Sequence, residues 1–301
     1  MSMSCQSNKY KAFPYIRLRL LVVFLLPFVF PLNGCVSTSA VAEFAAVSKV
    51  AAEKFPEVAA DFKASCKRRS RYESLRHSVY DLSTIQKYSD RQCADFKALE
   101  PYLIAANKVL MEYMETMGRL ASDDVVTFDK NLNDLAANLN AVGNIEQSQI
   151  NAVNGIIKVI SRAAADGWRR KKLAEVIGNT NDDVHILIAA LKIIVGSDYK
   201  QLLSNEELGM KDYYLGSIKD FKKQDPLTVV LVHERWDEAE DSLQAKRAGA
   251  DAYVQILEKI ARGHQRLYDN RNKLNSKETK IMVLGYAKEL GPLVKDLRKA
   301  F

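Results

Sequence analysis

Apolar residues recur at alternating steps of three and four along most of the chain, which is the spacing of one face of an α-helix. The clearest run extends from Phe96 to Leu120 and contains only such steps. Comparable runs predict further helices over residues 41–62, 128–142, 150–164, 182–221, 225–267 and 276–301. The period-two alternation typical of half-buried strands does not stand out anywhere in the sequence. The pattern therefore predicts an all-α protein.

Prolines and short polar segments predict where these helices begin and end. Pro56 is expected to interrupt the first helix, and Pro101 to lie in the first turn of the second. Asp182-Asp183, Asp225-Pro226 and Ser276 are suited to helix starts. Loop signals recur at residues 122–124, 178–182, 224–226 and 270–276. Because the helices are long and the loops short, we expect residues 41–301 to form one elongated antiparallel helical bundle with coiled-coil-like packing.

One segment, Val184–Val195, is apolar almost all round, and Lys192 is its only formally charged residue. A helix of this kind usually forms the buried centre of a bundle. The alternative is a hairpin that is held back for insertion into a membrane. At about 12 residues the segment is too short to cross a bilayer alone, which takes about 20 residues.

The first 34 residues differ in composition from the rest of the chain. They carry four basic residues and no acidic one, and they include an apolar run from Leu20 to Leu32 that two prolines interrupt. A basic segment followed by an apolar one is the layout of a secretory signal. The run of 13 residues is shorter than the roughly 20 of a membrane-spanning helix. Residues 1–34 are therefore predicted to be a signal peptide that is removed.

The apolar run ends in Leu32-Asn33-Gly34-Cys35, which resembles the lipobox of bacterial lipoproteins. In that family the chain is cut before the cysteine, whose sulfur carries a diacylglycerol. The resemblance covers residues 1–35 and implies a lipid tether on Cys35, followed by a short linker over residues 35–40. Val36 after the cysteine implies the outer membrane, facing the periplasm, by the sorting rule of enterobacteria. Cleavage after Ala40 would instead release a soluble protein, and an uncleaved segment would be a poor anchor.

Charge and cysteine content narrow the range of partners and compartments. Removal of residues 1–34 lowers the formal net charge from +7 to +3, so the high pI is weak evidence for an anionic partner, and we expect no nucleic acid. Cys66 and Cys93 remain in a chain bound for an oxidising compartment, which favours a disulfide. By closing a loop of 27 residues it would stabilise the fold by roughly 3–4 kcal/mol. The alternative is a pair of buried free thiols.

The patterns of familiar enzymes are not recognisable. The sequence contains no G-x-S-x-G turn, dinucleotide fingerprint or P-loop. His233 and Asp237 share a helix face that could hold a metal, but a solvated face is the plainer interpretation, and His185 and His264 are interpreted as packing residues. Asp123-Asp124 is interpreted as a helix start, since catalytic carboxylates converge across a cleft. We therefore predict no catalytic residue, cofactor or metal site, and a protein that is not an enzyme.

Two basic clusters are candidates for contact with an anionic surface such as phospholipid headgroups or a cell-wall polymer. The first is Lys67-Arg68-Arg69 with Arg71, and the second, which carries the stronger expectation, comprises Trp168, Arg169, Arg170, Lys171 and Lys172. Tryptophan beside cations suits a membrane interface. The alternative in both cases is an ordinary solvated helix end.

The sequence thus predicts a membrane-tethered envelope lipoprotein that acts as a non-enzymatic scaffold, spacer or binding module through long helix faces. Its expected partners are the membrane, through Cys35, and an envelope protein or cell-wall polymer. Two alternatives stay open, a helical membrane-active protein and an enzyme with an unrecognised site. The oligomeric state is also open.

Overall fold

The computed structural model describes residues 38–77, 80–132, 134, 145–223 and 225–301, and its helices belong to one unit, Ser37–Phe301. The first predicted helix is two helices, α1 (Ser39–Ala52) and α2 (Phe55–Arg76). The break falls directly before Pro56, as predicted, because proline fits the first turn of a helix but not its interior. α1 begins two residues earlier than expected and takes the end of the predicted linker into the fold.

Two helices follow, and they differ from the prediction in instructive ways. α3 (Leu82–Gln92) was not predicted, because its only buried residues are Ile85 and Ser89, too few to make a 3-4 pattern. Asp81 caps it by accepting a hydrogen bond from the backbone N–H of Thr84. α4 (Ala94–Ser122) confirms the helix predicted around Phe96–Leu120.

The expected role of Pro101 was wrong, since Pro101 lies inside α4 rather than in its first turn. Its ring displaces the hydrogen bond that the carbonyl of Lys97 would normally accept. Both residues are exposed, so water can satisfy that carbonyl. The pair Asp123-Asp124 is not a helix start either. Asp123 is the C-cap of α4, with the left-handed φ of 66°.

The middle of the chain forms α6 (Gln147–Ala165), α7 (Leu173–Ile193) and α8 (Lys200–Phe221), with a 3₁₀ turn at Arg170–Lys172 and a π-helical segment at Ile194–Tyr199. α6 confirms the helix predicted over residues 150–164, whereas most of the one predicted over 128–142 lies outside the described residues. The start predicted at Asp182-Asp183 was wrong, because α7 begins at Leu173. The polar residues before Asp182 are helical, and Thr180 among them is buried, with its hydroxyl 2.8 Å from the carbonyl of Val176.

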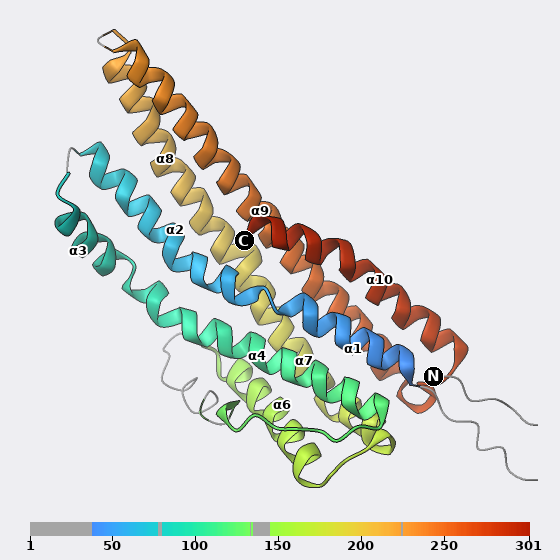
Figure 1. Ribbon diagram of the computed structural model, residues 1–301. Helices are drawn as coiled ribbons and strands as arrows, with labels where there is room; N and C mark the ends of the chain where they lie inside the picture. The colour runs from blue at the N-terminus through green and yellow to red at the C-terminus, as the bar shows by residue number, and fades with distance from the viewer. Residues whose placement is uncertain (1–37, 78–79, 133, 135–144, 224) are drawn as a thin grey trace, which may run out of the picture. The chain divides into compact units, whose positions relative to one another are not determined.

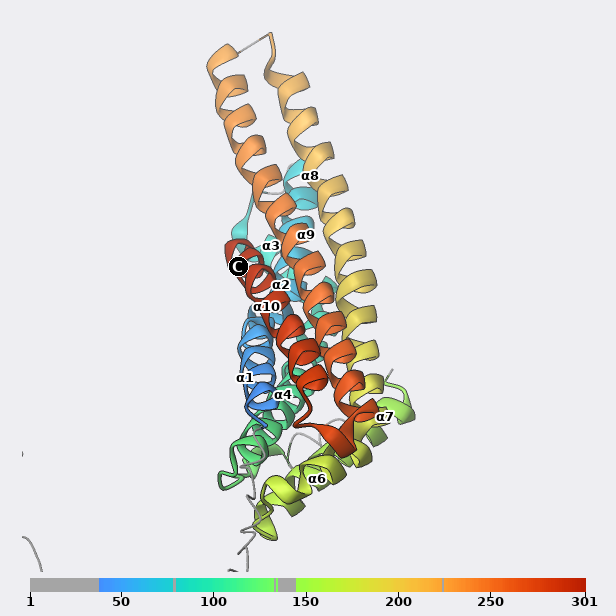
Figure 2. The same ribbon diagram turned by 90° about the vertical axis from the view of Figure 1, so that its right-hand side faces the viewer.

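The C-terminal half of the bundle confirms both predicted helix starts. α9 (Pro226–Asp269) is capped by Asp225, whose side chain accepts from the backbone N–H groups of Leu227 and Thr228. A 3₁₀ turn at Arg271–Lys273 leads to α10 (Lys277–Ala300), which Ser276 caps. Short loops join α8 to α9 and α9 to α10, so neighbouring helices run antiparallel (Figure 1). α8 and α9 continue as a two-helix hairpin past the end of α10 (Figure 2).

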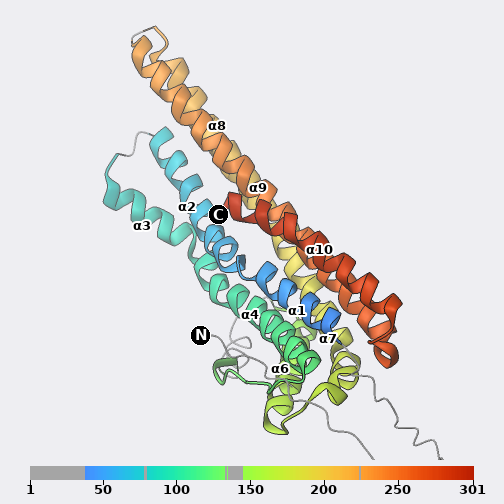
Figure 3. The same ribbon diagram turned by 45° about the vertical axis from the view of Figure 1, so that its right-hand side comes forward.

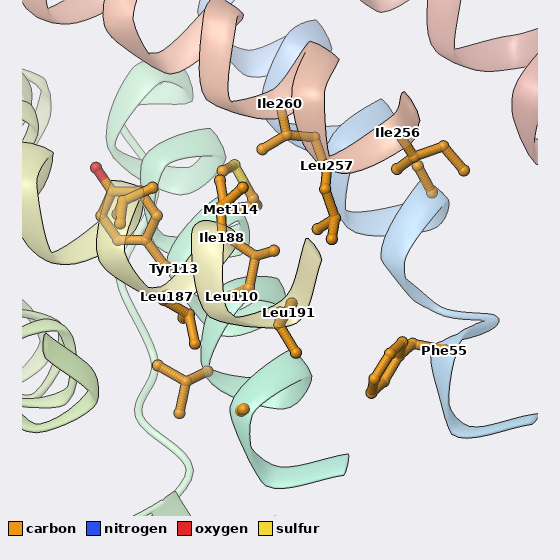
Figure 4. Packing of buried hydrophobic residues seen from close by; sticks show 14 of the residues in the cluster. Phe55, Leu110, Tyr113, Met114, Leu187, Ile188, Leu191, Ile256, Leu257 and Ile260 are labelled. Atoms are coloured by element: carbon orange, nitrogen blue, oxygen red, sulfur yellow. The ribbon is translucent and has the colours of Figure 1, made fainter. Parts of the chain in front are cut away.

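The core lies where α1, α4, α7 and α9 meet. The apolar segment Val184–Val195 supplies its centre, as predicted for a buried helix: Leu187, Ile188 and Leu191 are each 1% exposed. Figure 4 shows these three side chains among residues of α4 and α9, including Leu110, Met114, Leu257 and Ile260. One narrow face of the segment is not covered, since Ile193 is 61% exposed. The described residues contain helices and no strand, which confirms the predicted all-α bundle.

Candidate functional site

The predicted disulfide is present between Cys66 and Cys93, whose Cα atoms are 5.9 Å apart. Cys66 lies in α2, and Cys93 lies at the junction of α3 and α4. The bond therefore holds the α3–α4 junction against α2. The predicted lipidation site, Cys35, lies outside the described residues. Ala40, the alternative cleavage position, is in the first turn of α1 and is 3% exposed.

The second basic cluster does not present an exposed tryptophan. Trp168 is only 7% exposed, and the charged groups of Arg162 and Lys172 lie 5.5 and 5.3 Å from the centre of its ring. Tertiary packing turns the indole inward, so a membrane-interface role of Trp168 itself stays a prediction. The indole packs with the apolar core, and its cations cover it.

The cations of this cluster are also engaged within the protein. The Arg170 guanidinium donates to the carbonyl of Ala121, and its backbone N–H donates to Asp123. Lys172 pairs with Glu175 at 2.5 Å. Arg169 keeps one buried guanidinium nitrogen without a hydrogen-bond partner, and Lys171 is exposed. Contact of residues 168–172 with an anionic surface therefore stays a prediction, and among these residues Lys171 is the exposed one.

The first basic cluster is largely neutralised by acids of the same unit. Lys67 pairs with Asp90 at 2.6 Å, and Arg69 pairs with Glu73 at 2.8 Å. Arg68 is the most engaged, because it belongs to a buried ionic cluster that joins α2 to α8 and α9. The surface around residues 67–71 is thus less basic than the sequence alone indicates.

We use the name ionic cluster for Asp61, Ser65, Arg68, Tyr199, Glu206 and Lys246. Two guanidinium nitrogens of Arg68 donate to the two carboxylate oxygens of Asp61, at 2.9 and 3.0 Å. Arg68 also donates to both oxygens of Glu206, which accepts a further bond from Ser65. Every one of these contacts links two charged or polar partners, as buried charges require. The cluster therefore fixes how α2, α8 and α9 pack.

Charge and burial act against each other on Asp61. Burial alone would raise the pKa of this carboxyl, but the hydrogen bonds and charge of Arg68, the Tyr199 hydroxyl and Lys246 outweigh it and hold the pKa below its usual value. Burial and the Asp61 charge raise the pKa of Tyr199 far above its usual value, so Tyr199 stays protonated and donates to Asp61 at 2.6 Å. An ionised Asp61 and a protonated Tyr199 suit a structural cluster, because the carboxylate accepts the hydrogen bond that the hydroxyl donates.

A second buried polar group comes closest to the composition of an enzyme site. The Tyr113 hydroxyl lies 2.7 Å from Nε2 of His264 and 2.7 Å from the Thr180 hydroxyl. Burial and the neighbouring His185 lower the pKa of His264 to about 3, so its imidazole is neutral at physiological pH. Tyr113, Thr180 and His264 are each 0% exposed. A substrate cannot reach these side chains in this conformation, and the group serves as polar packing between α4, α7 and α9.

Among the described residues, few other groups could bind a ligand or a metal, and these are open to solvent. A hollow of about 300 Å³ between α2 and α3 is lined by Glu73, Ser74, His77, Thr84, Tyr88 and Arg91. No cluster of three or more His, Cys, Asp or Glu side chains suited to a metal ion occurs among the described residues. His233 stacks on Trp236 with ring centres 6.4 Å apart. Among the described helices, none combines the length and the apolar character that crossing a bilayer requires.

The most unusual surface is the outer part of α9, which the sequence analysis did not single out. No residue of α9 before Leu243 is buried, although the rest of the helix buries eleven. Leu227, Val230 and Leu231 are 68%, 53% and 53% exposed. Exposed aliphatic side chains gathered on one helix face are typical of surfaces that bind a partner. The available signal was the uncharged run Pro226–Val232, which reads equally well as buried helix.

The comparisons with known proteins add no functional information. No family model matches the chain, and neither a curated protein nor a solved structure matches it. On its geometry, the exposed outer part of α9 is the strongest candidate for a functional site.

Proposed function

We propose that this chain is a membrane-tethered lipoprotein of the bacterial cell envelope, and that it acts as a non-enzymatic scaffold, spacer or binding module through its long helix faces. The tether would be a lipid on Cys35, and the working surface would be helical.

The observation that carries this proposal is the outer part of α9. None of the seventeen helical residues Pro226–Ser242 is fully buried, although one side of the segment is partly covered. At about 1.5 Å per residue the segment extends for about 25 Å. A helix that packs on a single neighbour gains little stability from burial. Its exposed aliphatic residues would cost solubility unless a partner covers them. A binding surface accounts for both features.

The distance between the two ends of the helical unit also supports a role as a spacer. α1 begins at Ser39, near the end of the bundle where α9 and α10 are joined, and the α8–α9 connection lies at the opposite end (Figure 1). The 44 residues of α9 correspond to about 65 Å at 1.5 Å per residue. The outer part of α9 therefore lies at the end of the helical unit opposite to the start of α1.

In-cell crosslinking tests this function. Cells are treated with a lysine-reactive crosslinker, and adducts of the wild type are compared with those of a variant in which a cleavable soluble-export signal replaces residues 1–35. We expect a small set of envelope proteins on the tethered form and loss of most of this set from the untethered form. Equal capture by both forms, or no adduct on either, would contradict the proposal. Circular dichroism of both forms checks that the helical unit is unchanged.

A further inference from the structure

The packing of α10 on α9 defines a stripe of small residues along α9. Ala245, Ala248 and Ala252 of α9 line a shallow hollow together with Lys299 and Ala300 of α10. They follow one another at steps of three and four, so they share a helix face. The stripe is covered as far as Gly249, where an added Cβ would lie 2.5 Å from that of Ala300. α10 ends there, part-way along α9 (Figure 3).

The same stripe continues along α9 beyond the end of α10. Steps of four and three from Ala245 toward the N-terminus of α9 reach five further residues on this face. Val230, which lies beside Leu231, belongs to the same face, and we call the six residues together the α9 track. The α9 track consists of Leu227, Val230, Leu231, Glu234, Glu238 and Asp241. All six are exposed. The α9 track thus lies on the same face of α9 as the stripe that α10 contacts, and in the structure its side chains face solvent.

The α9 track has two chemically distinct halves. Its outer half is aliphatic and more than half exposed at each residue. Its inner half carries three carboxylates, Glu234, Glu238 and Asp241. The cation Arg235 pairs with Glu238 at 2.7 Å, but both side chains are at least 67% exposed, and such pairs are weak. The inner half therefore keeps a negative field toward solvent.

We propose that the α9 track is the docking site for an amphipathic helix of a partner protein, which packs on the same face of α9 as α10 does. This inference rests on the proposed function and names its binding surface. Aliphatic residues of the partner helix would cover Leu227, Val230 and Leu231. Lysine or arginine residues one to two turns further along would meet Glu234, Glu238 and Asp241. Recognition of a helix by a groove through side chains spaced three and four apart follows the same geometry as α9–α10 packing.

Charge argues against a second copy of this chain as the occupant. In a parallel pairing of two α9 tracks, carboxylates would face carboxylates and repel each other. In an antiparallel pairing, the carboxylates of one copy would be buried against the aliphatic half of the other, which costs their hydration. An anionic lipid surface would likewise repel the inner half. A cationic, amphipathic protein helix satisfies both halves at once.

Site-specific photocrosslinking in cells tests the proposal with the full, tethered chain. A photoreactive amino acid replaces Val230 in the α9 track, or Leu208 as a control, which is 67% exposed on α8. We expect an adduct from position 230 and not from position 208. Peptide mapping should place the adduct in a partner segment with apolar residues at helical spacing and lysine or arginine within two turns.

A charge reversal provides the second arm. E234K/E238K should lower the yield from position 230 by roughly tenfold, because it replaces attraction to the partner's cations by repulsion. The milder E234Q/E238Q should give an intermediate yield. E43K/E278K makes the same change of net charge at exposed residues of α1 and α10 and should leave the yield unchanged. Melting curves exclude unfolding as the cause.

The outcomes separate this proposal from the function on which it rests. A partner captured from position 208 or by the lysine-reactive reagent, but not from position 230, would overturn the docking site and leave the scaffold function standing. Adducts from position 230 with lipid, with a second copy or with an acidic segment would also overturn it. So would a yield that E234K/E238K does not lower.

Discussion

Arg68→Met tests whether the ionic cluster holds the bundle together. The substitution removes the guanidinium that bonds to both Asp61 and Glu206 while keeping an unbranched apolar side chain of similar length. The carboxylates of Asp61 and Glu206, 7% and 4% exposed, would then depend on neutral donors and on Lys246, which is 3.2 Å from Asp61. Buried carboxylates without their main partner destabilise the folded state.

The expected loss is about 3 kcal/mol at pH 7, the low end of the range for a broken buried ion pair. We choose the low end because the Arg68 side chain is 32% exposed, so water can replace part of its contribution. With a urea m-value of about 3 kcal/mol per molar for a chain of this size, the unfolding midpoint should fall by about 1 M. Arg69→Met is the matched control, because its pair with Glu73 joins side chains 43% and 36% exposed and should contribute about 0.5 kcal/mol or less.

The pH dependence gives the same test a second readout. Because the folded pKa of Asp61 lies below its usual value, the wild type keeps this stabilisation above about pH 4 and loses it as pH falls through the folded pKa. In Arg68→Met, burial should raise the pKa of Asp61 instead, so protonation on acidification favours the folded variant. The stability gap between wild type and variant should therefore narrow from pH 7 to pH 4. A gap that stays constant, or a loss no larger than that of Arg69→Met, would refute the reasoning.

Three further predictions follow from the packing. Reduction of Cys66–Cys93 should lower the free energy of unfolding by about 3–4 kcal/mol, because the loop of 27 residues gains entropy in the unfolded chain; coincident urea curves with and without reductant would contradict this. Tyr113→Phe should cost about 1–3 kcal/mol in thermal unfolding, since the fully buried His264 loses its bond to the hydroxyl; an unchanged melting temperature would argue against that bond. Leu187→Asp should abolish the cooperative melt seen by circular dichroism, because it buries a charge at a site 1% exposed. Ile193→Asp, at a site 61% exposed, should change stability by about 0.5 kcal/mol or less, and equal effects of the two would show that α7 is not buried as described.

The parts of the fold that local chemistry decides could be predicted from the sequence. Asp225-Pro226 and Ser276 start α9 and α10 because a capping side chain and a proline act on the backbone within three residues. The disulfide could be predicted on a different ground, the cysteine content. If residues 1–34 are removed and Cys35 carries a lipid, Cys66 and Cys93 are the cysteines left to pair.

The parts that depend on distant contacts could not be predicted. Thr180 lies in a stretch that reads as a loop, but in the structure it is helical and buried, and its hydroxyl donates to that of Tyr113, 67 positions away. Arg68 was predicted to be part of a basic surface because the sequence does not show that it donates a hydrogen bond to Glu206, 138 positions away. Trp168 was expected at a membrane interface because the sequence does not show that its indole packs into the core beneath Arg162 and Lys172.

The outer part of α9 shows a different limit. Hydrophobic spacing identifies an apolar face but does not state whether the same chain covers it. The structure shows that the aliphatic residues of this face are exposed, which hydrophobic spacing alone cannot show.

The most direct test of the account is the intact mass of the protein purified from the envelope fraction, with and without reduction and thiol alkylation. A tethered lipoprotein predicts the mass of residues 35–301 plus acyl chains, with two thiols alkylated only after reduction. A mass without lipid, for a chain that starts after Ala40 or at Met1, would contradict the tether and with it the proposed role in the envelope.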